Sequence, residues 1–284
     1  MIKLFVLIGS FGLSTLITLL LNFNEAWMIA VGIIGIGLAF VLLFGIMLFF
    51  IAWLFILRLE KNETPEKYSK VYRKVYNRYQ LFLLSLFGVK LTVNGLYKVP
   101  KKTNFILFQN HLSNVDPIFT DYVLRKFPMI FVAKESLFKI PFFGRIIRHI
   151  GYVKVIRKSG LDDTQEMARG LKWIQANECS LCVYPEGTRN KTFPNPIILD
   201  LKEGTMSFAK KSGRPIVISA IHGTEKINDK LLLKVHKIQI DILEVIPPEE
   251  YEKMSPQELA DLVRKILIDG INNPSKEKEK VRLY

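Results

Sequence analysis

The chain reads FILFQNHLSNVDP at residues 105–117, an apolar, strand-like run followed by His111 and Asp116 five positions apart. In a continuous helix, 3.6 residues per turn would put these two side chains about 140° apart, so they would not meet. Pro117 disfavours the helical conformation at Asp116 and suits the first position of a helix that begins there, with Asp116 as its N-cap. The stretch therefore predicts a strand, a turn that folds Asp116 back toward His111, and the start of a helix.

This pairing of residue types has a chemical meaning. A neutral histidine oriented by a buried carboxylate is the usual device for deprotonating a hydroxyl near neutral pH. His111 and Asp116 are therefore the candidate catalytic residues. Taken alone, this spacing is more typical of a histidine that is hydrogen-bonded in the protein core than of a catalytic histidine. Further motifs are needed to favour catalysis.

The segment from about residue 90 alternates between two patterns, and this alternation predicts the fold class. Strands interleaved with helices predict an α/β fold with a largely parallel sheet flanked by helices, here over residues 91–271. A charged tail, residues 272–284, follows. The β-rich runs are 90–93, 104–108, 129–133, 152–156, 180–184, 215–221 and one or two strands within 231–245. The helical stretches are 117–126, 143–149, 163–176, 203–211 and a last helix opened by the capping box Ser255–Glu258.

The N-terminal 60 residues predict a membrane anchor. Residues 4–21 and 26–57 carry no charge, and each run reaches the roughly 18 residues that mark a membrane helix. We expect a hairpin of two apolar helices, of which the second is long enough to tilt, bend or lie partly in the interface. Glu25 is the only charge between the runs and six basic residues follow within 58–74, so both ends are expected in the cytoplasm.

Residues 61–90 predict a basic amphipathic helix. Thr64 is the expected N-cap, and apolar or tyrosine side chains then recur every three or four positions among lysines and arginines. Such a helix suits a membrane interface. A surface helix docked on the globular domain explains the pattern equally well.

The net charge of +14 indicates either nucleic acid or an anionic membrane surface as a partner. The apolar runs favour the membrane, and no nucleic-acid motif is present. Cys179 and Cys182 form a C-x-x-C on an apolar run without a second ligand pair, so they are predicted to be buried small residues and not zinc ligands. We expect neither a metal nor a cofactor.

Polar and charged residues follow several of the predicted strands. They are Lys134, Arg157 and the turn Glu186-Gly187-Thr188-Arg189. The carboxyl ends of parallel strands meet at one edge of a sheet, and arginine forks match phosphate oxygens, so these residues are candidate phosphate ligands. Each has a plainer alternative: Arg157 as a surface ion-pair partner, Lys134 as a solvated side chain, and Glu186 as a group that orients Arg189 or the turn.

In order and spacing, these motifs resemble the glycerophospholipid acyltransferases, specifically the 1-acyl-sn-glycerol-3-phosphate acyltransferases. The resemblance covers about residues 91–224. A similar linker lies at 132–144, and the chain departs from the family pattern at Val153-Lys154, at Ser219-Ala220 and at Tyr184, where phenylalanine is common. The four boxes are Asn110–Asp116, Gly151–Arg157, Pro185–Arg189 and Pro215–Val217.

The resemblance implies an enzyme that transfers a fatty acyl group from acyl-CoA or acyl carrier protein to the sn-2 hydroxyl of lysophosphatidic acid, giving phosphatidic acid. It implies that His111 is the general base, that Asp116 holds it, and that Arg157 and Glu186–Arg189 bind the glycerol phosphate with Lys134 in support. The alternatives are transfer to another lysophospholipid, hydrolysis of a lipid, or a non-catalytic membrane-anchored lipid-binding protein.

Overall fold

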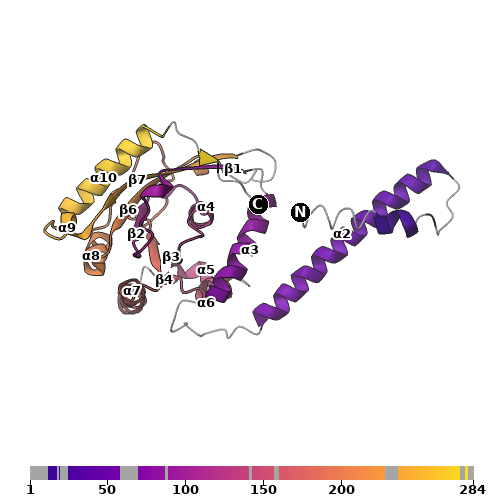
Figure 1. Cartoon of the computed structure of the whole chain (residues 1–284), viewed down its shortest axis with the longest axis horizontal. Coiled ribbons are helices and arrows are strands. Elements are labelled where there is room, and N and C mark those ends of the chain that lie inside the picture. The colour runs from indigo at the N-terminus through magenta and orange to yellow at the C-terminus, as the bar shows by residue number, and fades with distance from the viewer. Residues whose placement is uncertain are drawn as a thin grey trace. The chain divides into compact units, whose positions relative to one another are not determined.

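The computed structural model describes residues 12–17, 19, 25–57, 70–86, 89–140, 143–156, 160–227, 236–275 and 279–280. Two compact units divide the chain, residues 1–61 and residues 62–284. Figure 1 shows the elements of both units along the chain.

The N-terminal unit contains one long apolar helix, α2 (Ala26–Leu57). Its segment Trp27–Met47 is long and apolar enough to cross a membrane. At 1.5 Å per residue, the whole helix is about 48 Å long, which exceeds a hydrocarbon core of about 30 Å. Residues 12–17 are also helical, and the Ser14 hydroxyl donates a hydrogen bond to the Ile33 carbonyl oxygen. Most of the first apolar run lies outside the described residues, so the hairpin remains a prediction.

The second unit is built on an eight-stranded mixed sheet with the order β4-β3-β5-β2-β6-β7-β1-β8. The five strands from β4 to β6 are mutually parallel, β7 runs antiparallel to β6, and β1 is parallel to β7. The predicted α/β class with a largely parallel sheet is therefore confirmed. The strands are β1 (Val89–Asn94), β2 (Ile106–Gln109), β3 (Met129–Lys134), β4 (Val153–Val155), β5 (Ser180–Val183), β6 (Ile216–His222), β7 (His236–Ile246) and β8 (Glu279–Lys280).

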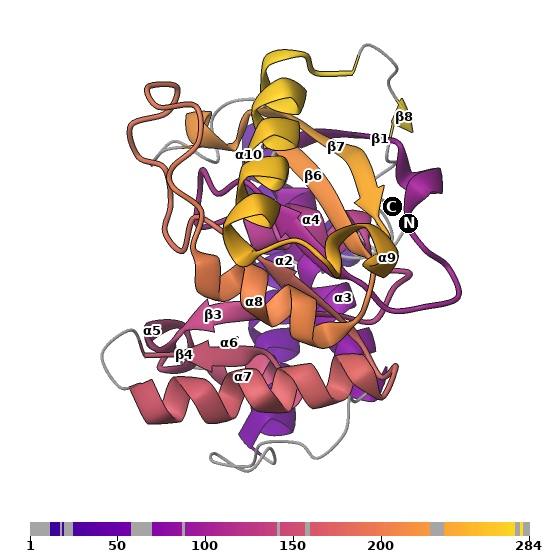
Figure 2. The same cartoon turned by 90° about the vertical axis from the view of Figure 1, so that its left-hand side faces the viewer.

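Helices cover both faces of this sheet. In Figure 1, α7, α8 and α10 lie on one side of it, and α3 and α4 lie on the other. Figure 2, turned by 90°, shows α10 and α8 in front of the strands. The strands β2 and β5 are buried along their whole length, as expected for parallel strands covered on both faces. The helices are α3 (Lys70–Leu86), α4 (Asp116–Val123), α5 (Glu135–Phe138), α6 (Phe143–His149), α7 (Gly160–Gln175), α8 (Glu203–Ser212), α9 (Pro248–Tyr251) and α10 (Pro256–Asn272).

The helix α3 packs on the sheet unit through a buried polar contact. Arg73 forms an ion pair with Asp121 of α4 and donates a hydrogen bond to the Met129 carbonyl oxygen at 3.1 Å. Gln80 donates to the Ile118 carbonyl oxygen at 2.6 Å. Burial raises the pKa of Asp121 even though Arg73 acts in the opposite direction. One face of α3 is thus docked on the domain, and the interfacial role of residues 61–90 remains a prediction for its exposed face, which includes Lys74 and Arg78.

Candidate active site

His111 and Asp116 meet in the turn after β2. The His111 Nδ1 lies 2.8 Å from the Asp116 Oδ2, and the Asp116 side chain is fully buried, whereas 17% of the His111 side chain is exposed. The turn predicted from the spacing is therefore confirmed. In the part of the chain that the structure describes, no group hydrogen-bonds the other ring nitrogen, Nε2, which remains available to an incoming hydroxyl.

The predicted N-cap role of Asp116 is wrong. The helix α4 already includes Asp116, its N-cap is Val115, and no side chain caps it. The Asp116 Oδ2 instead accepts hydrogen bonds from the backbone N–H groups of Leu112 and Ser113, at 2.7 and 2.8 Å. Because these donors precede the helix, the carboxylate closes the His111 turn and does not serve the helix behind it.

Glu186 and Asn190 clamp the backbone of His111 from the neighbouring strand. The turn 185–190 follows β5, which pairs with β2. The Glu186 Oε1 accepts from the His111 N–H at 2.7 Å, and the Asn190 N–H donates to the His111 carbonyl oxygen at 2.7 Å. The Glu186 Oε2 accepts from the Leu199 N–H at 2.9 Å. Burial raises the pKa of Glu186, although these two N–H donors partly offset it.

Tyr184 forms one wall of the His111 site. Its ring stacks on the imidazole with a centroid separation of 4.0 Å and an interplanar angle of 18°. The Tyr184 side chain is almost wholly inside the protein, with a relative exposure of 8%, and burial raises the pKa of its phenol well above the ordinary value of 10. The imidazole is thus held on one edge by Asp116 and on one face by Tyr184.

The predicted phosphate ligands end neighbouring strands of the same sheet edge. Lys134 ends β3, which lies beside β5, and Thr188 and Arg189 lie in the turn after β5. Lys134 and Thr188 are exposed and Arg189 is half-buried, and these three form no ion pair with other described residues. Arg157 falls outside the described residues, two positions after the end of β4.

Two glycines of the motifs have conformational reasons to be there. Gly187 has a φ of +68°, a conformation that favours glycine, and this allows the turn after β5. Gly151 has a φ of +89°, and a Cβ there would lie 2.1 Å from the ring of Trp173. Gly187 lets the backbone turn beside the site, whereas Gly151 serves packing against α7.

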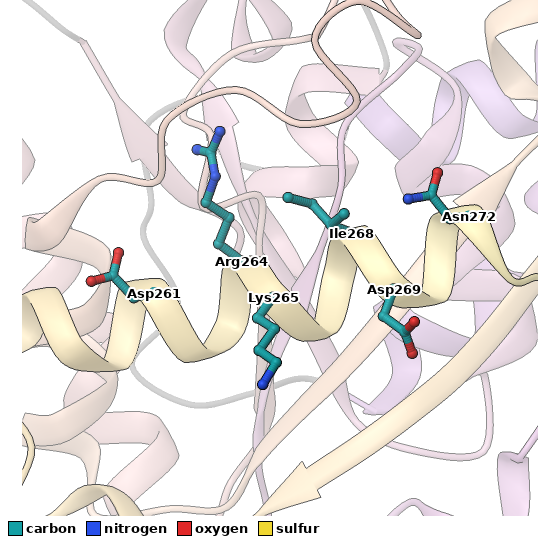
Figure 3. A pocket seen from close by; sticks show the side chains of 6 residues that line it. All are labelled: Asp261, Arg264, Lys265, Ile268, Asp269 and Asn272. Carbon is teal, nitrogen blue, oxygen red and sulfur yellow. The ribbon is translucent and has the colours of Figure 1, made fainter.

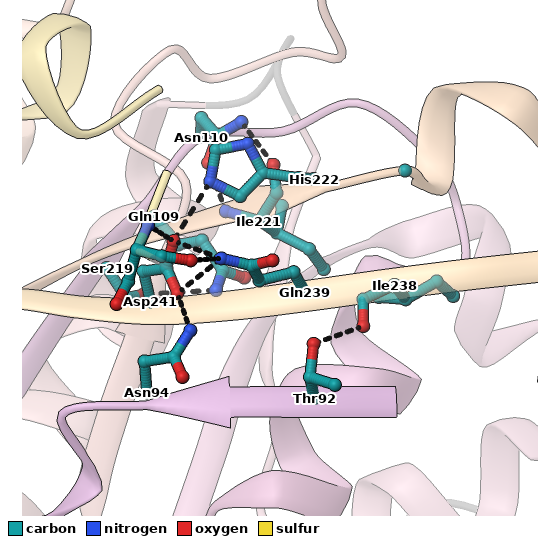
Figure 4. A network of polar contacts seen from close by, with 12 residues as sticks. Thr92, Asn94, Gln109, Asn110, Ser219, Ile221, His222, Ile238, Gln239 and Asp241 are labelled. Atoms are coloured by element: carbon teal, nitrogen blue, oxygen red, sulfur yellow. Dashed lines mark hydrogen bonds and ion pairs between the residues drawn. The ribbon is translucent and has the colours of Figure 1, made fainter. Parts of the chain in front are cut away.

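Sequence reasoning missed the partners of Asn110. Its carboxamide accepts from the Ile221 N–H at 2.8 Å and donates to the Ile221 carbonyl oxygen at 3.1 Å, which ties the residue before His111 to β6. His222 follows Ile221 and lies 3.5 Å from Asp241. The neighbouring network is visible in Figure 4.

Two further features lie apart from these residues. Cys179 and Cys182 are buried and not bonded to each other, as predicted, and burial raises the pKa of Cys179 to about 12. An open hollow lies beside α10 and contains none of the predicted site residues (Figure 3). Its lining consists of Asp261, Arg264, Lys265, Ile268, Asp269 and Asn272.

Comparisons with known proteins show the family of the chain. The family model described as Acyltransferase matches residues 90–222. The 1-acyl-sn-glycerol-3-phosphate acyltransferase of Borreliella burgdorferi is 28% identical over 186 residues, which cover 64% of this chain and 71% of that protein. A Mycoplasma pneumoniae protein named "Probable 1-acyl-sn-glycerol-3-phosphate acyltransferase" is 30% identical over 220 residues, covering 71% and 79% of the two chains.

A solved structure matches as well. The 1-acyl-sn-glycerophosphate (LPA) acyltransferase PlsC from Thermotoga maritima has a TM-score of 0.55 and 25% identity, and the match covers 73% of this chain and 85% of that one. The chain belongs to the acyltransferase family, and the relatives named above are 1-acyl-sn-glycerol-3-phosphate acyltransferases.

Proposed function

We propose that the chain is a 1-acyl-sn-glycerol-3-phosphate O-acyltransferase, which moves a fatty acyl group from a thioester to the sn-2 hydroxyl of lysophosphatidic acid and yields phosphatidic acid. The contact of the His111 Nδ1 with the Asp116 Oδ2 at 2.8 Å is the observation that carries this proposal. The names of the relatives support the choice of acceptor. The donor is acyl-CoA or acyl carrier protein.

The geometry supports a direct transfer with His111 as general base. Asp116 accepts the Nδ1–H, so the lone pair on Nε2 takes the proton of the acceptor hydroxyl. The hydroxyl oxygen then bonds to the thioester carbonyl carbon and forms a tetrahedral oxyanion, which backbone N–H groups stabilise. When the carbon–sulfur bond breaks, the thiolate takes the proton back from the imidazolium and leaves as the thiol.

The basic residues of the motifs are proposed to hold the phosphate. Lys134, Arg157 and Arg189 supply positive charge, and Thr188 supplies a hydroxyl donor. Both carboxylate oxygens of Glu186 already accept backbone N–H groups, and a carboxylate repels a phosphate. Glu186 therefore contributes to substrate binding by fixing the turn that carries Thr188 and Arg189.

The N-terminal helix is proposed to keep the enzyme on its lipid substrates. α2 has the length and composition of a membrane span. We propose that the catalytic unit lies on the cytoplasmic face, because basic residues follow this helix and positively charged flanks tend to stay inside.

The test compares two histidines of one sheet edge. Acyl transfer to lysophosphatidic acid is measured with the detergent-solubilised full chain, His111→Ala and the matched control His222→Ala, using acyl-CoA and acyl carrier protein donors in turn. We expect His111→Ala to lose about 10²- to 10⁴-fold of the rate, the usual contribution of a general base, and His222→Ala to keep it. Undiminished transfer by His111→Ala would remove the proposed base, and release of free fatty acid without an acylated acceptor would indicate a hydrolase.

A further inference from the structure

The stack of Tyr184 on His111 has a consequence for the orientation of the base. The backbone of His111 is fixed on both sides, because its N–H donates to Glu186 and its carbonyl oxygen accepts from Asn190. The remaining freedom belongs to the side chain. The torsion that turns an imidazole ring about its Cβ–Cγ bond has a broad energy profile, so the backbone alone does not set the ring plane.

The contact with Asp116 fixes one point of the ring. One hydrogen bond at Nδ1 leaves the ring free to tilt about the line that joins Nδ1 to the carboxylate oxygen. Such a tilt moves Nε2, which lies at the opposite side of the ring. A second constraint on the plane of the ring is therefore needed to aim Nε2, and the face of Tyr184 at 4.0 Å supplies it.

We infer that Tyr184 is a positioning residue, whose ring holds the plane of the His111 imidazole so that Nε2 faces the acceptor hydroxyl. This inference rests on the proposed function, in which His111 is the base. The Tyr184 ring is itself fixed, because the side chain is buried and its carbonyl oxygen accepts from the Gly187 N–H at 2.9 Å within the same turn. An aromatic face also favours the imidazolium that forms when His111 takes the proton.

The ring, and not the hydroxyl, performs this role. The Tyr184 hydroxyl is buried near Thr120 and Cys182 and makes no hydrogen bond of ordinary geometry with the described residues. A buried hydroxyl without a well-aligned partner adds little stability, so we expect its removal to change the Tm only slightly. Phenylalanine at this position therefore preserves the stack, whereas a flexible apolar side chain of similar size fills the space without providing a flat face.

The experiment measures kcat and KM for acyl transfer by the detergent-solubilised full chain and four variants. Tyr184→Met is expected to lower kcat about 10- to 100-fold with KM within about twofold, since misaligned reacting groups lose rate and not binding. Tyr184→Phe is expected to stay within about threefold of the parent. The matched control Phe105→Met removes a buried ring just before β2, at the end of that strand away from His111, and we expect it to lower the Tm but to keep kcat.

The outcomes separate this inference from the function on which it rests. A kcat of Tyr184→Met within threefold of the parent, or an equal loss in Tyr184→Phe, would overturn the positioning role. If the fourth variant, His111→Ala, keeps its activity, the proposed role of His111 as the base is contradicted. If His111→Ala is inactive while Tyr184→Met keeps its activity, only the positioning role of Tyr184 is contradicted.

A spectroscopic measurement covers the case in which Tyr184→Met does not fold. In the unmutated chain with isotope-labelled histidine, the ring current of Tyr184 is expected to shift the His111 ring protons upfield of those of His222. His111→Ala assigns the signal. Equal shifts for the two histidines would show that the stack is absent in solution and would overturn the inference.

Discussion

Among the described residues, two histidine–carboxylate pairs lie at the ends of adjacent parallel strands, and they differ in how the carboxylate is held. Asp116 meets His111 at 2.8 Å, and Asp241 meets His222 at 3.5 Å. Both carboxylates are buried, and both imidazoles are about one-fifth exposed. The residue types are therefore the same, and the surroundings decide what each pair does.

The donors to the two carboxylates come from different places. Among the described residues, one oxygen of the Asp116 carboxylate accepts hydrogen bonds from His111, Leu112 and Ser113, and the other oxygen is buried without a partner. Asp241 takes donors from Asn94 of β1, Gln239 of β7 and the Ser275 N–H after α10, on both oxygens (Figure 4). The first pair orients one imidazole, whereas Asp241 of the second pair joins β1, β7 and the segment just after α10.

The largest expected difference between the pairs is in activity. Asp116→Asn replaces an acceptor that fixes the His111 ring, and we expect a loss of acyl transfer of the order of 10²-fold or more. Asp241→Asn is expected to change the rate by less than about threefold. The steady-state rates of the two variants at neutral pH test this difference. Equal losses of rate would mean that both pairs take part in catalysis.

Asn110 lies between the two pairs and tests whether they are coupled. Asn110→Ala removes both hydrogen bonds to Ile221 and frees the residue before His111, so we expect kcat to fall about tenfold through misalignment. The control Asn104→Ala changes the same residue type at the other end of β2. If the control loses as much rate as Asn110→Ala, the effect is a general loss of packing.

His222→Ala is expected to act on stability. Loss of a half-buried ring beside Asp241 is expected to lower the Tm by about 2–4 °C, the shift for about 1 kcal/mol in a domain of this size. Thermal unfolding of the catalytic unit in detergent measures it. An unchanged Tm would mean that the contact of His222 with Asp241 does not contribute to stability.

The smallest expected effect is a pH dependence at Asp241. Burial raises the pKa of this carboxyl, but the nearby His222 imidazole and the hydrogen bonds from Asn94, Gln239 and Ser275 outweigh it, so the pKa is lowered from 3.8. A lowered carboxyl pKa stabilises the folded state above the unfolded value and loses that contribution as pH falls through the folded value. The Tm difference between the parent and Asp241→Asn is therefore expected to be larger at pH 6 than at pH 3, and a difference independent of pH would contradict it.

Much of the sheet was predictable because its parallel strands are buried on both faces. Such strands appear in the sequence as short apolar runs, and each predicted run from 90–93 to 215–221 contains a strand. The reversal at β7 was not predictable from these runs. β7 pairs with β1 across roughly 147 positions, as in the pairing of Val89 with His236, and local patterns carry no information about such a pairing.

The site divides in the same way. His111 and Asp116 are five residues apart, so spacing and Pro117 sufficed to bring them together. The bonds from Glu186 and Asn190 to the His111 backbone span 75 and 79 positions and depend on the register of β5 beside β2. The N-cap at Asp116 was predicted wrongly because a carboxylate at a helix start has two sets of N–H donors within reach, and here it accepts the earlier set.

The ion pair between Arg73 and Asp121 bears on how the enzyme can be shortened. Asp121 belongs to the helix that begins with Asp116, and its cation comes from α3, far upstream in the sequence. A truncated form that begins at β1 would lack Arg73 and leave the buried Asp121 carboxylate without its cation, at a cost of about 3–5 kcal/mol. A shortened protein that lacks the apolar helix α2, made for work in aqueous buffer, should therefore begin upstream of Lys70.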